Sequence, residues 1–162
     1  MDKILIDNLV IFSAIIYYAF LCLIYLLRVF ERDKQELMLA PVFSFLLVPF
    51  LTLLVLNLLN RSDIWRLITL LPITIYLFYD LWYRFITKKK PQHHPDRWPI
   101  ALILYLILLQ IGSIALNWYG YLVSKFYGHV LVISYFVMVG CFGFYQYRYN
   151  KRKKSTKKLM LN

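Results

Sequence analysis

Glycine, proline and cysteine are all scarce in this chain of 162 residues, which contains five glycines, six prolines and two cysteines. With so few glycines, the sequence has no glycine-rich loop to hold a phosphate group. It contains no GxGxxG, Walker A, HExxH or GxSxG motif, and no motif identifies a family. Cys22 and Cys141 both lie in apolar runs. Their positions argue against a disulfide framework and against a cysteine-based metal site.

Charge is also scarce, because charged residues make up 17% of the chain and hydrophobic residues 61%. A soluble domain has about 25% charged and about 45–50% apolar residues. Disorder is excluded as well, since aromatic residues account for 19% of the chain and disordered chains are poor in them. The composition therefore predicts a polytopic membrane protein.

Five apolar runs are each close to the length of about 20 residues that a helix needs to cross a bilayer. The first run follows two acids and a single Lys3, so we interpret it as a retained span and not as a signal peptide. The predicted fold is an all-α bundle of five transmembrane helices in residues 1–150, followed by a basic cytoplasmic tail in residues 151–162. The predicted spans are about 9–27, 37–59, 67–86, 99–118 and 126–147.

The basic residues are distributed unevenly between the predicted connections. The first connection holds three Lys or Arg, the third holds five and the C-terminal segment holds seven, whereas the N-terminus, the second and the fourth hold one, two and one. Five spans thus place 15 basic residues on one side and four on the other. By the positive-inside rule, the N-terminus is expected outside and the C-terminus in the cytoplasm.

Asp80 is an ionisable residue inside the third predicted span, and Arg84 follows it by four residues. An ionisable group at membrane depth usually faces the interior of a bundle or a cavity. An acid four residues before a base on a helix is in the favourable order for an ion pair. We predict either a proton, cation or headgroup site at Asp80, or a structural Asp80–Arg84 pair near the cytoplasmic boundary.

Two of the predicted spans carry polar stripes. In the third span, Tyr76 and Tyr83 share a helical face with Asp80. The fourth span has a matching stripe, which consists of Gln110, Ser113 and Asn117. Both stripes are expected to face protein, because polar groups are costly in lipid. We interpret these residues and Arg84 either as candidates for an ion or substrate path or as hydrogen-bonding contacts between helices.

The third connection contains the weak metal-site candidates His93, His94 and Asp96. Adjacent histidines seldom both bind one ion in good geometry, and three prolines make this segment a stiff connector. We therefore interpret it as an interfacial turn and expect neither a metal nor another cofactor.

Basic residues in the third connection and in the tail are candidates for binding anionic lipid headgroups, which attract each nearby charge by about 1 kcal/mol. They are Lys88, Lys89, Lys90, Lys151, Arg152, Lys153, Lys154, Lys157 and Lys158. The tail also serves as a topology determinant, and we do not expect nucleic acid to be its partner.

Three classes of function agree with the sequence. The absence of catalytic motifs favours a non-enzymatic subunit, assembly factor or accessory factor, which contacts anionic lipids and other membrane subunits or a second copy of itself. The alternative is a small oligomeric transporter or channel with Asp80 lining its path. A second alternative is a membrane enzyme that acts on a lipid, with Asp80 or the His93–His94–Asp96 segment as its acid–base groups.

The plasma (inner) membrane is the expected location, and an organellar membrane is the alternative.

The orientation is testable with a reporter that is active only outside the membrane. We expect activity from fusions before Met1 or between Ser62 and Asp63, and none from a fusion after Asn162, because the basic connections and the tail stay in the cytoplasm. A cytoplasmic location of the Ser62–Asp63 connection would contradict the arrangement of five spans.

Overall fold

The computed structural model describes residues 3–30, 32–60, 62–86 and 100–159. Among them, residues 33, 34, 37, 40, 84, 86, 101, 102 and 152–159 are described for the backbone only. The elements are α1 (Lys3–Val29), α2 (Asp33–Ser44), α3 (Leu47–Leu59), α4 (Ile64–Leu81), the π-helical turn η1 (Trp82–Ile86), α5 (Ile100–Val123) and α6 (Lys125–Leu159). All regular structure in these residues is thus helical.

Five helical segments are long and apolar enough to cross a membrane, which confirms the predicted number of such helices. They are Lys3–Val29, Pro41–Leu59, Ile64–Leu81, Ile103–Val123 and Lys125–Lys151. The first begins six residues before the predicted start and includes Asp7. Asp7 can lie within the helix because Arg66 of α4 binds its carboxylate.

The second apolar segment is divided into α2 and α3, and Pro49 explains where the division falls. Proline has no N–H group, and its ring collides with the carbonyl four residues earlier, which here belongs to Phe45. The Phe45 carbonyl instead accepts a hydrogen bond from the Val48 amide at 3.0 Å. Residues 45 and 46 form a turn, so α2 ends at Ser44.

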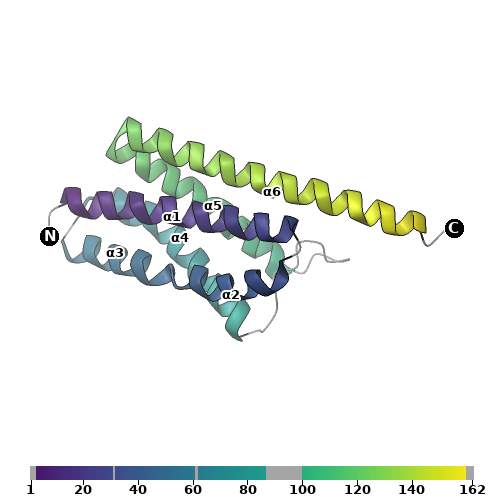
Figure 1. Ribbon diagram of the computed structural model, residues 1–162. Helices are drawn as coiled ribbons and strands as arrows, with labels where there is room; N and C mark the ends of the chain where they lie inside the picture. The colour runs from purple at the N-terminus through teal and green to yellow at the C-terminus, as the bar shows by residue number, and fades with distance from the viewer. Residues whose placement is uncertain (1–2, 31, 61, 87–99, 160–162) are drawn as a thin grey trace.

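The helices form a bundle in which α1 packs against α2, α3, α5 and α6, while α4 packs against α2, α3 and α5. The start of α1, the end of α3 and the turn between α5 and α6 lie at one end of the bundle, and the end of α1 and the start of α2 lie at the other (Figure 1). An ion pair between Arg28 and Glu36, 2.6 Å long, joins α1 to α2 at this second end.

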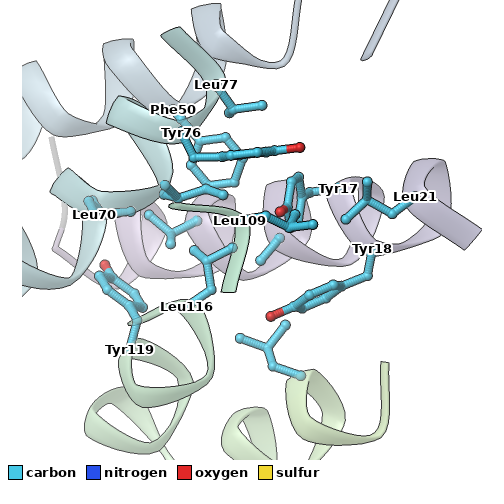
Figure 2. Packing of buried hydrophobic residues seen from close by; sticks show 14 of the residues in the cluster. Tyr17, Tyr18, Leu21, Phe50, Leu70, Tyr76, Leu77, Leu109, Leu116 and Tyr119 are labelled. Atoms are coloured by element: carbon cyan, nitrogen blue, oxygen red, sulfur yellow. The ribbon is translucent and has the colours of Figure 1, made fainter. Parts of the chain in front are cut away.

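Tyrosine rings fill much of the interior. Tyr17, Tyr18, Tyr76 and Tyr119 are among the largest fully buried side chains, and Figure 2 shows Tyr17, Tyr18 and Tyr76 projecting between the helices. The rings of Tyr17 and Tyr76 meet edge to face, with centroids 6.3 Å apart. A tyrosine ring buries a large apolar area, but its hydroxyl needs a hydrogen-bond partner when buried. The core therefore carries polar groups into the middle of the bundle.

Glycines permit close approaches at two helix interfaces. A Cβ atom on Gly112 would lie 3.1 Å from Ile73 Cα, where α5 meets α4. A Cβ atom on Gly120 would lie 3.1 Å from Gly128 Cα, where α5 meets α6. These short distances leave no room for a side chain, so glycine at these positions sets how closely the helices pack.

The last helix, α6, lies at the edge of the bundle and continues beyond the end of α1 (Figure 1). It has 35 residues, against 27 in α1. Only 17% of its most apolar stretch is buried inside the bundle, compared with 33–44% for the other four spanning segments. The rest of the bundle thus covers α6 much less than it covers the other helices.

Candidate functional site

Asp80 lies at the C-terminal end of α4, and its side chain is fully buried. Ser44 of α2 donates a hydrogen bond from Oγ to Asp80 Oδ2 at 2.9 Å. The Tyr105 hydroxyl of α5 donates to Asp80 Oδ1 at 3.0 Å. Both carboxylate oxygens therefore have donors, and these donors come from two other helices.

Local irregularities of the backbone surround this carboxylate. Ser44 is the last residue of α2, so the break before α3 lies beside Asp80. The π-helical turn η1 begins at Trp82, two residues after Asp80. π-helical turns and broken transmembrane helices occur frequently at functional sites. Asp80 is thus the carboxylate of the bundle whose surroundings most resemble a functional site.

A chain of hydroxyl groups leads from Asp80 into the core. Tyr105 hydrogen-bonds Tyr76 at 2.8 Å between the two hydroxyl oxygens. The ring of Tyr76 lies against that of Tyr17, whose hydroxyl is 3.4 Å from Ser113 Oγ. The hydroxyls thus form two short hydrogen-bonded groups, and a contact between two aromatic rings joins them.

The second predicted stripe has its hydrogen-bond partners on α1 and α6. The Tyr18 hydroxyl lies 2.9 Å from the Ser113 carbonyl oxygen and 3.0 Å from Asn117 Oδ1, and these two acceptors share its single proton. The Tyr135 hydroxyl of α6 donates to Gln110 Oε1 at 2.8 Å. Ser113 is fully buried, Asn117 is half-buried and Gln110 is exposed. Residues of this stripe thus connect α5 to α1 and α6.

A second buried acid lies near the opposite end of the bundle. Arg66 donates to both oxygens of Asp7, from Nε at 2.9 Å and from Nη2 at 2.8 Å. The Tyr119 hydroxyl donates to Asp7 Oδ1 at 2.6 Å. Arg66 also pairs with Asp63, whose side chain is 56% exposed. This cluster joins α1, α4 and α5 and neutralises the buried carboxylate.

Sequence reasoning identified part of these clusters and missed the rest. Tyr76, Asp80 and Tyr83 are all buried, as the stripe predicted. The donors Ser44 and Tyr105 were not predicted. A tyrosine in the middle of an apolar span, away from the bilayer boundary where tyrosine is favoured, was the available signal for Tyr105. The distant pairing of Asp7 with Arg66 left no local pattern in the sequence.

Several predicted site residues lie outside the part of the chain that the structure describes. These are Lys88, Lys89, Lys90, His93, His94 and Asp96. The side chain of Arg84 is also outside it, so the predicted Asp80–Arg84 pair stays a prediction. Arg152, Lys153, Lys154, Lys157 and Lys158 continue α6, with the backbone alone described, and the Lys151 side chain is exposed. Within the described residues, no group of three histidine, cysteine, aspartate or glutamate side chains could hold a metal.

An apolar groove of about 330 Å³ lies between α1 and α2. Its lining consists of Leu23, Leu27, Gln35, Met38 and Leu39. None of these side chains is ionisable, so the groove brings no acid–base group to a substrate that would occupy it. It also does not include Asp80.

Comparisons with family models, with curated proteins and with solved structures find no match. Assignments of function therefore depend on this chain's own residues. Chemically, the Asp80 cluster offers a carboxylate and exchangeable hydroxyl protons, which suit the binding of a proton or a small cation. The Asp7 cluster is a closed ion pair that suits a structural role.

The Asp7–Arg66 pair predicts an asymmetry between single and double substitutions. Arg66→Gln should strongly lower the melting temperature in detergent, because removing one partner of a buried pair costs about 3–5 kcal/mol. Asp7→Asn combined with Arg66→Gln should recover most of the loss. As a control, Asp63→Asn should have little effect, since Asp63 is exposed and such pairs are weak. A native melting temperature for Arg66→Gln would contradict a stabilising pair.

Proposed function

We propose that the chain is an integral membrane protein with its N-terminus outside and its C-terminus in the cytoplasm, acting as a non-enzymatic subunit, assembly factor or accessory factor. The small coverage of α6 by the rest of the bundle carries this proposal. Although α6 packs against α1 and α5, the large unburied share of its apolar stretch leaves a face with room for a partner helix. The partner is another membrane subunit or a second copy of this chain.

Two glycines on the open side of α6 support a close helix contact. A Cβ atom at Gly140 or Gly143 would meet nothing within 4 Å. Glycine inside a helix costs about 1 kcal/mol relative to alanine, and the packing of this bundle does not require it at these two positions. Small residues are favoured in membranes where another helix approaches closely. Val137, which is 56% exposed, precedes Gly140 by one helical turn.

The C-terminal part of α6 supports contacts with anionic headgroups. The helix continues to Leu159 without interruption, and its basic residues follow each other at spacings of one and three from Arg148 onward. At these spacings the basic positions are distributed around all sides of a helix. Where such a helix emerges from the bilayer, its basic positions can meet anionic lipid phosphates on all sides. Each positive charge then contributes about 1 kcal/mol of binding free energy near the surface.

Site-specific photocrosslinking in native membranes tests the partner contact. A photoreactive residue at Val137 should give a discrete protein adduct, and the same residue at Phe78 of α4, which is also exposed, should give lipid adducts only. An adduct at twice the mass of the chain identifies a second copy, and another mass identifies a different subunit. Lipid adducts alone at both positions would contradict the proposal.

Substitution of the two glycines is the matched control for that experiment. Gly140→Leu with Gly143→Leu should reduce the Val137 adduct by about tenfold, which corresponds to ~1.4 kcal/mol of lost association. The melting temperature of the purified chain should not change, since both positions open onto free space. Gly112→Leu should instead lower the melting temperature, because its side chain would collide with Ile73.

A second candidate function is a proton path through Asp80. The observation that favours it is the combination of a fully buried carboxylate, a broken helix at Ser44 and the hydroxyls of Tyr105 and Tyr76 in sequence. Ionisable residues inside membrane bundles commonly mark proton relays. In this reading, the proton moves between the carboxylate and the neighbouring hydroxyls.

Proton flux into liposomes that contain the purified chain tests this candidate. With a membrane potential imposed, the interior of liposomes that contain the native protein should acidify faster than the interior of empty liposomes, as an internal pH dye reports. Asp80→Asn should abolish the excess flux, and Tyr105→Phe should lower it, because each substitution removes an exchangeable proton site from the hydroxyl chain. Thr74→Val is a control, since the Thr74 hydroxyl bonds only its own helix, at the Leu70 carbonyl. A native flux equal to that of empty liposomes would exclude the path.

A further inference from the structure

The first and the last of the spanning helices, α1 and α6, run parallel in a constant register. Contacts between them join residues that are 117 to 119 positions apart. These contacts are the hydrogen bond from Tyr127 to Asn8 (3.0 Å), the rings of Tyr18 and Tyr135 (centroids 6.2 Å apart) and the rings of Tyr25 and Phe142 (centroids 5.2 Å apart). Cys22 and Cys141 are also 119 positions apart. The register therefore places the only two cysteines of the chain opposite each other.

The two cysteines lie in the same part of this interface. Both fall between the Tyr18–Tyr135 and Tyr25–Phe142 ring contacts that join α1 to α6. Both cysteines are reduced and half-buried, and both pack against the hydrophobic core. A disulfide requires neighbouring Cβ atoms, and the register of α1 and α6 brings the two cysteines to matching positions on the two helices.

We propose that Cys22 and Cys141 form a reversible dithiol–disulfide site that is oxidised by a lipid-soluble two-electron acceptor of the quinone class. The exposed neighbours of the pair are apolar, among them Leu23, Leu26 and Val139. A water-soluble oxidant has no access through such a surface once it faces lipid. The choice of a lipid-soluble acceptor rests on the proposed membrane insertion, whereas the pairing of the two thiols does not.

The reaction is balanced by the thiols and the quinone alone. Both S–H bonds break and one S–S bond forms. The two electrons and the two protons reduce the quinone to the quinol. Dithiothreitol reverses the reaction by exchange with the protein disulfide.

Oxidation would fasten α6 covalently to α1. The bond closes a loop from Cys22 to Cys141, which contains α2, α3, α4 and α5, and closing a long loop restricts the unfolded chain most. Because α6 is the spanning helix that the bundle covers least, the bond should stabilise the attachment of α6 more than that of the other helices. We expect the melting temperature to rise by about 5–10 °C on oxidation.

The test uses the purified full-length chain in liposomes, treated either with decylbenzoquinone or with ferricyanide. The quinone should produce a chain lighter by two hydrogen atoms, remove maleimide labelling from both cysteines after unfolding, and raise the melting temperature. Dithiothreitol should reverse all three changes. Cys22→Ser and Cys141→Ser should each keep one maleimide-reactive cysteine and the melting temperature of the reduced protein. Ferricyanide should oxidise the native chain at least tenfold more slowly.

Two results would overturn the proposal, each at a different step. If neither oxidant forms the bond while both cysteines label after unfolding, the two thiols are not a redox pair. If ferricyanide acts as fast as the quinone, the pairing holds but the lipid-soluble acceptor is wrong, and the membrane position of this interface is contradicted. Neither result depends on whether α6 binds a partner helix, which photocrosslinking measures separately.

Discussion

Two carboxylates, those of Asp7 and Asp80, lie inside a bundle whose remaining interior is mostly apolar, and each must find its partners there. Burying a charge without partners raises the free energy of the folded state by far more than one hydrogen bond lowers it. Arg66 and Tyr119 satisfy Asp7, while Ser44 and Tyr105 satisfy Asp80. Since these partners come from other helices, each carboxylate fixes the relative position of three helices. Apolar packing alone is less specific about such positions, because hydrophobic side chains of similar volume can replace one another.

Tyrosine is the residue that makes this arrangement compatible with an apolar core. Its ring buries a large apolar area in the core, and its hydroxyl hydrogen-bonds the polar groups that lie near the ring. Tyr17, Tyr18, Tyr76 and Tyr105 are all buried, and all have hydroxyl partners on neighbouring helices. Replacing such a residue with phenylalanine keeps the packing and removes one hydrogen bond. The polar network can thus be altered without opening a cavity.

The sequence is informative about what depends on local composition and uninformative about what depends on distant contacts. Length and hydropathy predicted five apolar helices, and helical spacing predicted that Tyr76, Asp80 and Tyr83 share a buried face. The same spacing could not show that Tyr105 meets Asp80, because the relative rotation of two helices is set by packing. Asp7 was assigned to the region before the first span because its neutralising partner, Arg66, is 59 residues away. The break after Ser44 follows from Pro49, but a proline alone does not tell whether a helix bends or ends.

The two carboxylate clusters hold α1, α2, α4 and α5 together, and none of the cluster residues named above belongs to α6. Its side-chain hydrogen bonds to α1 and α5, at Tyr127 and Tyr135, join neutral groups, so each is worth only about 0.5–1.5 kcal/mol. The attachment of α6 therefore depends on apolar contact with α1 and α5, on the close approach at Gly120 and Gly128, and on the interface that contains the two thiols. A helix attached in this way can change its contacts without breaking a buried ion pair. For that reason α6 is the element through which the proposed partner helix or the proposed oxidant would act on this bundle, while the clusters at Asp7 and Asp80 keep the remaining helices in place.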